Sequence, residues 1–144
     1  MRTDDPGILG SHRLVRHLVT PLQIVRSPEG MKISSQAFIT RKEHVGISID
    51  LECLLIANGK QADSRFGTLR DTLAMGVVTA DDARQTAQGV AWTPKPLDET
   101  KEGAARDANP EHGEIILGDM GSSARRKASR ALSERCKIIR QVES

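Results

Sequence analysis

The chain has 144 residues, the size of one ordinary domain, which leaves no room for a second catalytic lobe. Hydrophobic residues make up 38% of it, the mean hydropathy is -0.39 and the net charge is +2, so the composition predicts a soluble globular protein. No run of about 20 apolar residues occurs, which argues against a membrane-spanning helix. The aromatic side chains are only Phe38, Phe66 and Trp92, too few for the stacking platform that binds single-stranded nucleic acid.

The amino-terminal residues, the cysteines and the histidines predict the cellular compartment and the metal chemistry. Asp4 and Asp5 stand where an export signal carries Lys or Arg, so we expect a cytoplasmic protein, from a bacterium. Cys53 and Cys136 are too few for a disulfide framework, so we expect two reduced thiols in or near the core. We expect no metal and no cofactor, because the four histidines lack HxH or HExxH spacing; they are His12, His17, His44 and His112.

The first third of the chain predicts a helix, a hairpin and a strand–helix unit. Apolar residues over residues 12–19 recur at helical spacing, and Thr20-Pro21 ends the predicted helix. Ser27-Pro28-Glu29-Gly30 suits a type I turn, which predicts a hairpin between residues 22–26 and 31–40. Residues 45–59 begin as a strand, after which Asp50 is expected to cap a short helix that Asn58-Gly59 ends.

The middle of the chain mixes one ambiguous segment with one clear helix. Over residues 63–76 the apolar side chains Phe66, Leu69, Leu73 and Met75 favour a helix, while Gly67 and Thr68 weaken it. Residues 79–82 form an N-cap and an acidic first turn, so a helix is expected from there to about Gln88. Gly89 ends it, and residues 90–92 predict a short strand. Trp92 is expected to be mostly buried, as the largest apolar side chain.

The last third predicts a loop, a buried strand and a long basic helix. Residues 93–109 are rich in charge and proline, which predicts a mobile loop, and residues 1–10 are expected to be flexible as well. Residues 112–117 predict a strand. Ser122 or Ser123 is expected to cap a helix over residues 122–140, in which Arg135 interrupts an apolar stripe. We therefore predict one α+β domain, with a small mainly antiparallel sheet and three or four helices, closed by the basic C-terminal helix.

The predicted terminal helix concentrates positive charge. It holds seven basic residues against Glu134, a local charge of +6, so the rest of the chain carries -4. One interpretation of this asymmetry is a phosphate-rich or acidic partner, either nucleic acid or a larger protein. The other is a solvated helix face, which the helix dipole favours at the carboxyl end. The candidate contact residues are Arg125, Arg126, Lys127, Arg130 and Lys137. The preceding GDMGSS turn lacks the GxxxxGK[ST] pattern of a P-loop, so it predicts a capped turn.

Polar residues at the start of the predicted strand 112–117 suggest a second kind of site. His112 can act as an acid or base near neutral pH, and Glu114 is expected to point the same way on a strand. Together with Ser34, Ser35 and Asp50 they form a candidate catalytic set. The alternative is that these are satisfied polar residues at a strand entrance.

Short motifs give the chain a resemblance to known proteins. Ser34-Ser35-Gln36-Ala37-Phe38 is an SSxAF motif, which Ile47-Ser48-Ile49-Asp50, Val77-Val78-Thr79, Pro110-Glu111-His112 and the basic segment 122–140 follow. In these motifs the chain resembles a widespread group of small bacterial proteins without an assigned function. The resemblance covers most of residues 11–140 and implies a common fold and a shared site, but it brings no reaction with it.

A weaker similarity is to ADP-ribosyltransferase-like folds, whose NAD pocket uses an Arg or His on the first strand, a serine strand and a late Glu. Arg16, Ser34 or Ser35, and Glu114 follow that order. Such enzymes keep aromatic residues around the nicotinamide, and this chain, which has no tyrosine, departs from that pattern.

Two functional hypotheses follow, and the sequence leaves open whether the protein is an enzyme. The first is a non-enzymatic binding or accessory subunit, in a bacterial conflict or defence system, that meets a larger protein or nucleic acid through the basic helix. The second is a small transferase or hydrolase that uses the candidate catalytic set. If the five side chains converge in one concave pocket, the enzyme hypothesis gains; if they scatter over separate faces, it fails.

Overall fold

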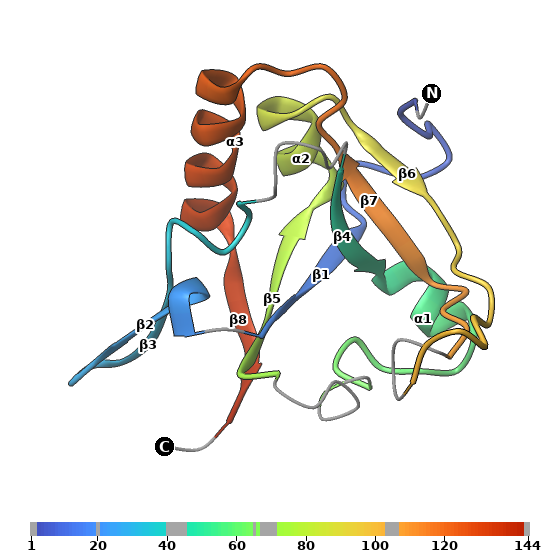
Figure 1. The fold of residues 1–144 in the computed structure, drawn as a ribbon, viewed down its shortest axis with the longest axis horizontal. Helices are drawn as coiled ribbons and strands as arrows, with labels where there is room; N and C mark the ends of the chain where they lie inside the picture. The colour runs from blue at the N-terminus through green and yellow to red at the C-terminus, as the bar shows by residue number, and fades with distance from the viewer. Residues whose placement is uncertain are drawn as a thin grey trace.

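The described residues form a six-stranded antiparallel sheet with three α-helices and a separate two-stranded hairpin (Figure 1). The computed structural model describes residues 3–19, 21–39, 46–64, 66, 72–102 and 107–142. Its elements are β1 (Arg13–Leu18), the 3-10 helix η1 (Pro21–Gln23), β2 (Ile24–Ser27), β3 (Gly30–Ile33), β4 (Gly46–Leu51), α1 (Glu52–Ala57), β5 (Ala74–Thr79), α2 (Ala80–Thr86), β6 (Val90–Trp92), β7 (His112–Ile116), α3 (Ser122–Arg135) and β8 (Lys137–Gln141). The α+β class, the mainly antiparallel sheet and the number of helices are as predicted.

The strands of the large sheet run in the order β6-β7-β4-β1-β5-β8, and β2 and β3 pair with each other. Figure 1 shows α2 and α3 together on one flank, the β2–β3 hairpin projecting from the body, and α1 near the opposite flank. The hairpin was predicted from its turn, and Ser27 pairs with Gly30 there, with Gly30 at φ 121. No helix in the described part of the chain is long and apolar enough to cross a membrane.

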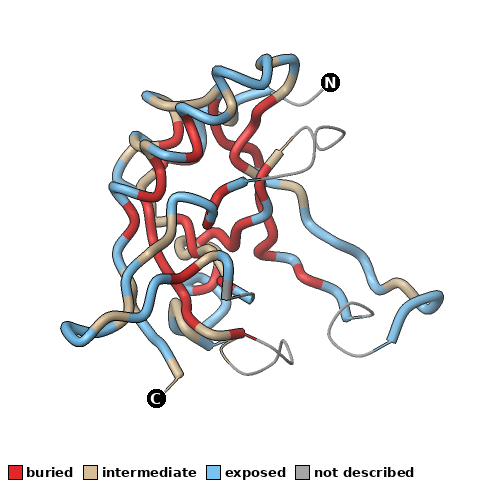
Figure 2. Tube along the Cα trace, turned by 60° about the vertical axis from the view of Figure 1, so that its left-hand side comes forward, coloured by how far each residue is buried: buried red, intermediate tan, exposed pale blue. Residues whose placement is uncertain are grey.

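The main hydrophobic core lies between one face of the sheet and helices α2 and α3. Leu14 and Leu18 of β1, Ile49 and Leu51 of β4 and Leu132 of α3 belong to one cluster of buried side chains. Figure 2 shows the buried segments gathered in the interior of the molecule, with exposed segments around them. The side chains that alternate with these on the strands point to the opposite face of the sheet.

The opposite face carries a much smaller apolar cluster. It consists of Val15, Met75 and Val77, against which Phe66 and Ile139 pack. Val15 pairs with Val77 on one side and with Asp50 on the other, so Asp50 lies on this face as well. The second face of the sheet is therefore the one on which a polar site can form.

The helix predicted over residues 12–19 is wrong, because this segment forms β1. Leu14 and Leu18 face the main core, whereas Val15 faces the small cluster on the other side. A central strand that is buried on both faces has apolar residues in neighbouring positions, and that pattern imitates a helical stripe. In the ambiguous segment of residues 63–76, Met75 favoured a helix, but it lies in β5; Leu69 is outside the described residues.

The short helix α1 forms where it was predicted, but Asp50 does not cap it. Leu51 is the N-cap residue, and no side chain bonds to the free N–H groups there. Asp50 is the last residue but one of β4 and is only 3% exposed. Gly59 has φ +75, the left-handed conformation expected to end this helix.

The terminal helix is shorter than predicted and starts differently. Its N-cap is Gly121, with no side-chain cap, so neither Ser122 nor Ser123 caps it. The helix ends at Arg135, and Lys137–Gln141 form β8 on the edge of the sheet beside β5. The strand forms because Ile138 and Ile139 suit a pleated surface and β5 offers unpaired backbone groups.

Arg135 does not interrupt a buried stripe, contrary to prediction. Its guanidinium is exposed and donates to Gln85 Oε1 of α2 at 2.8 Å. Ser129 and Ser133 complete the buried face beside Ala128 and Leu132. Ser133 Oγ donates to the Ser129 carbonyl oxygen at 2.8 Å, so its hydroxyl is satisfied within the helix.

Trp92 is not buried as predicted, since 51% of it is exposed. It ends the edge strand β6, and its indole Nε1–H donates to the Pro110 carbonyl oxygen at 2.7 Å. Phe38, at 1% exposure, is the aromatic residue that fills the core. The indole therefore fastens the loop that follows β6 instead of packing inside.

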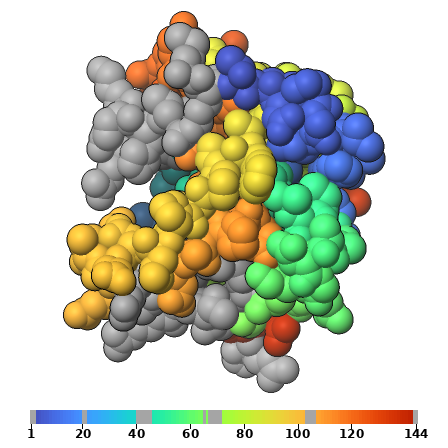
Figure 3. All heavy atoms as spheres, turned by 90° about the vertical axis from the view of Figure 1, so that its right-hand side faces the viewer, coloured from blue at the N-terminus to red at the C-terminus, as the bar shows by residue number. Residues whose placement is uncertain are grey.

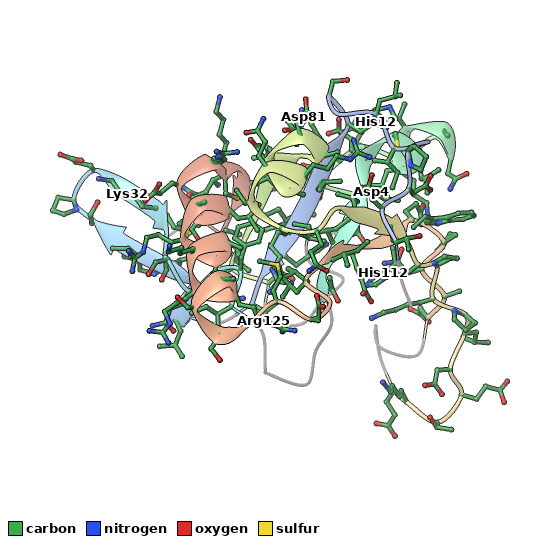
Figure 4. The ribbon with its side chains drawn as sticks, turned by 90° about the horizontal axis from the view of Figure 1, so that it is seen from above. Asp4, His12, Lys32, Asp81, His112 and Arg125 are labelled. Atoms are coloured by element: carbon green, nitrogen blue, oxygen red, sulfur yellow. The ribbon has the colours of Figure 1, made fainter. Side chains whose placement is uncertain are left out.

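The segment of residues 93–109 contains neither a helix nor a strand within its described parts, 93–102 and 107–109. Its two ends are joined, because Lys95 N donates to Asn109 O at 2.9 Å and Asn109 N donates to Lys95 O at 2.8 Å. The mobility expected of this loop stays a prediction. So does the flexibility of residues 1–10, of which Asp4 bonds to Arg84 of α2 and to Val90 N (Figure 4).

The two cysteines are free thiols near the core, as predicted. Cys136, the residue between α3 and β8, is buried, and Cys53 on α1 is half-buried. Burial raises the pKa of the Cys136 thiol to about 12 despite the nearby Arg16 guanidinium. Both sulfurs are therefore packing groups and not nucleophiles at neutral pH.

Removal of the Thr79 hydroxyl should destabilise the protein by about 1 kcal/mol, because Thr79 and Asp82 form a reciprocal capping box at the start of α2. The matched control is Ser122→Ala at the start of α3, which removes no cap bond and should change stability by less than about 0.5 kcal/mol. Urea denaturation of Thr79→Ala and Ser122→Ala measures both. Equal losses in the two variants would contradict the assignment of the caps.

Candidate functional site

A cluster of polar side chains lies on the second face of the sheet, where β1, β4 and β7 run side by side. Asp50 of β4 pairs directly with His112 of β7 and with Val15 of β1. His17 stands two residues beyond Val15 and therefore points to the same face as Asp50. Asn109, at the end of the loop before β7, contacts Asp50 through its side-chain amide. Figure 4 labels His112 in this part of the molecule.

The Asp50 carboxylate is the centre of this cluster. Its Oδ2 lies 3.1 Å from His17 Nε2, and its Oδ1 accepts a hydrogen bond from Asn109 Nδ2 at 2.9 Å. A carboxylate oxygen can only accept, so the His17 nitrogen that faces it carries the proton. Asp50 thus fixes both the ring orientation of His17 and the amide orientation of Asn109.

The imidazole of His112 is held separately, by the first residue of the loop. Its Nδ1 lies 2.8 Å from the Thr93 carbonyl oxygen and 2.9 Å from Thr93 Oγ1. Because a carbonyl oxygen accepts only, Nδ1 carries the proton and Nε2 holds a lone pair in the neutral ring. Burial lowers the pKa of His112 below its usual 6.5, against the effect of the bond to Thr93, so the ring is neutral at physiological pH.

These side chains line a cavity of about 540 Å³ between the sheet and the loop. Figure 3 faces this side of the molecule, where the surface is hollowed beside the loop of residues 93–102. His17, Asp50, Asn109 and His112 contribute to its wall, and Lys95 is among the loop residues that complete it. The volume lies within the range of about 300–1,000 Å³ that is typical of small-molecule sites.

Three polar atoms of this cluster are buried without a hydrogen-bond partner in the described part of the chain: His17 Nδ1, Asn109 Oδ1 and His112 Nε2. An unsatisfied buried polar atom costs about 1–3 kcal/mol, so three of them in one place need a reason. A ligand or water that supplies the missing bonds is such a reason.

Glu111 anchors the loop next to the cavity. Its side chain is fully buried, and Oε1 accepts from Lys60 Nζ and, at 3.4 Å, from Asn58 Nδ2. Burial acts to raise the pKa of this carboxyl, but the donors, with Lys60 foremost, hold it below its usual 4.5. The Glu111 carbonyl oxygen also accepts from Leu51 N at 2.8 Å, which fixes the backbone between Asn109 and His112.

The predicted catalytic set is only partly assembled. Asp50 and His112 meet as described, and Glu114 lies on the same face of β7 opposite Ser48, but outside the cavity wall. Ser34 and Ser35 are elsewhere: Ser34 Oγ accepts from Gln36 N, and the Ser35 carbonyl accepts from Ser129 Oγ of α3. The serines thus belong to the side of the sheet that α3 covers, and they do not join the other three.

Sequence reasoning missed His17 and Asn109. His17 was overlooked because its segment was interpreted as a helix, on which it would not face Asp50; alternation along a strand would have placed it correctly. Asn109 lay within the polar segment that drew attention, but only the pairing of distant strands shows that its amide reaches Asp50.

The described residues include no group of three or more His, Cys, Asp or Glu side chains that could hold a metal ion. His17 and Asp50 bond to each other and not to a common point.

The basic candidates of the terminal segment divide into two groups. Arg125 donates to the carbonyl oxygens of Met120 and Gly118 at 2.8 Å each, so it braces the turn before α3. Arg126, Lys127 and Arg130 are exposed on α3 and line a shallow depression of about 320 Å³. Lys137, predicted in the helix, lies in β8.

Comparison of the chain with protein-family models, with curated proteins and with solved structures found no match. The functional assignment therefore depends on the geometry of the cavity and on the surface of α3.

Stability should fall with pH from about 6.5 downward, because the unfolded His112 ring takes up a proton before the folded one does. Burial, with a smaller contribution from Lys95, lowers the pKa of this ring, and together they outweigh Thr93, Glu114 and Asp50, which act to raise it. His112→Asn keeps a donor toward the Thr93 carbonyl and removes the titrating ring. The loss of unfolding free energy between pH 7.5 and 5.5 should be smaller in this variant than in the wild type, as measured by urea denaturation.

The lower limit of pH 5.5 keeps Glu111 out of the measurement, since its pKa lies below 4.5. If His112→Asn loses as much stability over this range as the wild type, the ring is not kept neutral by burial.

Proposed function

We propose that the protein is a small hydrolase or transferase that binds a polar ligand in the cavity lined by His17, Asp50, Asn109 and His112. The observation that carries the proposal is the convergence of these side chains from three strands and one loop, with three of their polar atoms buried and unpartnered. Buried ionisable groups that meet in a concave pocket are typical of functional sites. Ser34 and Ser35 have no part in it.

The chemistry is general acid–base catalysis. Asp50 orients His17 through Nε2, which leaves the opposite nitrogen Nδ1 to take the proton of an attacking hydroxyl. The oxygen so activated attacks an electrophilic carbon or phosphorus atom, and the leaving group departs with a proton from the imidazolium. Water as the attacking group makes the reaction a hydrolysis, and a second substrate makes it a transfer. His112, neutral and with its Nε2 lone pair available, helps to hold the ligand.

Asp50→Asn should lower turnover about 10²- to 10⁴-fold, because the amide cannot hold the His17 ring as a base. The substrate is found by incubating the wild-type protein with a mixture of nucleotides, sugar phosphates and acylated compounds and following their consumption by mass spectrometry. The variant is then compared on the compound consumed. Asp63→Asn is the control, since Asp63 bonds to Arg140 away from the cavity.

Consumption of no compound by the wild type, or full activity of Asp50→Asn, would rule out the enzymatic proposal. Thermal unfolding of each variant shows whether the fold is retained.

A second candidate function rests on the exposed basic residues of α3. Arg126, Lys127 and Arg130 have no ion pair with another described residue, whereas Arg135 bonds to Asp82 and Gln85 of α2. Three unpaired cations on one helix suit an acidic or phosphate-rich partner. On this proposal the chain is an accessory subunit, in a bacterial conflict or defence system, that contacts nucleic acid or a larger protein through α3.

Replacement of Arg126, Lys127 and Arg130 by Gln should weaken nucleic-acid binding on all sequences alike, because phosphate contacts carry no base information. Affinity of the wild type should fall with salt with a slope of about -0.7 to -0.9 per contact, and the triple variant should lose that slope. Fluorescence anisotropy with duplex and single strands at several salt concentrations measures this. Arg125 is left unchanged because it braces the turn at Met120. A wild type that binds neither strand form at low salt leaves only a protein partner for this surface.

A further inference from the structure

The three unpartnered atoms in the cavity share one property, which is that each accepts hydrogen bonds. Asn109 donates to Asp50 through Nδ2, so its Oδ1 points the other way and can only accept. His112 donates to Thr93 through Nδ1, which leaves an accepting lone pair on Nε2. His17 faces Asp50 with its protonated Nε2, so Nδ1 accepts whenever the ring is neutral. A ligand that satisfies this cluster has to bring O–H or N–H donors.

The surrounding charges favour neutral hydroxyls over a cationic amine. Both oxygens of Asp50 already accept hydrogen bonds, from His17 and Asn109, and the residue is only 3% exposed, so a cationic ligand has little direct access to this carboxylate. Lys95 lies close enough to His112 to disfavour a positive charge on it. The same ammonium group would repel an amine ligand placed against that ring.

The loop side of the cavity offers a place for an anionic group. Lys95 and Lys101 both line it, together with Asp98 and Asp107. Hydrogen bonds from Thr100 lower the pKa of Asp98, and Lys101 adds a smaller effect in the same direction, so Lys101 lies near that carboxylate. Arg16 also lines the cavity, but its guanidinium donates to the carbonyl oxygens of Ala37 and Ser48. Lys95 has no ion pair with any described residue, so it is the lysine that a ligand can engage.

We propose that the cavity takes a phosphorylated sugar, with its hydroxyl groups against His17, Asn109 and His112 and its phosphate against Lys95. Vicinal hydroxyls supply several donors from one rigid ring, which matches three acceptors in one wall. The phosphate supplies a negative charge that can pair with the ammonium group of Lys95. This inference shares its cavity with the proposed function and names the class of its substrate.

The test uses four probes on the intact chain: D-ribose 5-phosphate, D-ribose, inorganic phosphate and agmatine, a cationic donor. Affinity is measured by calorimetry, and the ring nitrogens of His17 and His112 are followed by ¹⁵N NMR. Ribose 5-phosphate should bind at least about tenfold more tightly than ribose or phosphate alone, and it should shift His17 Nδ1 and His112 Nε2 in the direction of hydrogen-bonded acceptors.

Matched variants separate the two ends of the ligand. Lys95→Gln should weaken ribose 5-phosphate about tenfold and leave ribose unchanged, while Lys32→Gln, on the distant β2–β3 hairpin, should change neither. His17→Gln keeps a donor toward Asp50 and His112→Asn keeps one toward Thr93, and each removes the accepting imidazole nitrogen from its position, because the new amide oxygen lies elsewhere. Both should weaken ribose and ribose 5-phosphate alike, by about tenfold.

Three results would overturn the inference. Agmatine binding in place of ribose 5-phosphate would show that the cavity selects cations. Binding of ribose 5-phosphate that shifts neither histidine, or that Lys95→Gln leaves intact, would place the ligand elsewhere. No binding of any probe would exclude the sugar-phosphate class. The proposed function is judged separately, by turnover in Asp50→Asn, so that a protein that binds sugar phosphate without turning over any compound keeps the inference and loses the enzyme.

Discussion

The buried carboxylate of Asp50 needs hydrogen-bond donors, and this need ties three separate parts of the chain together. An unpaired charge at 3% exposure would cost several kcal/mol, and one donor comes from His17 on β1 and another from Asn109 on the loop. If the loop moved away from the sheet at Asn109, the Asp50 carboxylate would lose the hydrogen bond from the Asn109 amide, so this bond holds the loop in place. The hydrogen bonds that stabilise the buried Asp50 carboxylate therefore also fix the side chains in the wall of the cavity.

A second buried carboxylate strengthens this arrangement from the other side of the loop. Glu111 follows Asn109 by two residues and bonds to Lys60 and Asn58, just beyond α1. Two carboxylates thus hold the chain between Asn109 and His112. Asp50 on the sheet accepts from Asn109, and Glu111, within this segment, accepts from Lys60. His112 begins β7 directly after these anchors, so its ring enters the cavity from a rigid backbone, which is what a positioned acid or base needs.

The parts of the fold that were predicted correctly have local signals. Pro28 and Gly30 define the hairpin, and Thr79 with Asp82 defines the start of α2. The elements that were missed depend on distant partners: β1 is buried on both faces only because β4 and β5 flank it, and β8 exists only because β5 accepts it. Asp50 and His112 were predicted as site residues from their chemistry. That they lie opposite each other, with His17 on the same face, depends on strand register, which the sequence does not show.

The cavity and the basic surface of α3 have no lining residue in common. Leu132 of α3 packs with Leu14 and Leu18, whereas Asp50 shares the other face with Val15. Substitutions at sites this well separated, without shared partners, are expected to act independently. The proposed ligand site and the proposed partner surface therefore do not exclude each other. One chain can carry both the proposed catalytic site and the proposed partner surface. A variant that abolishes turnover then leaves binding through α3 measurable, and a variant of α3 leaves turnover measurable.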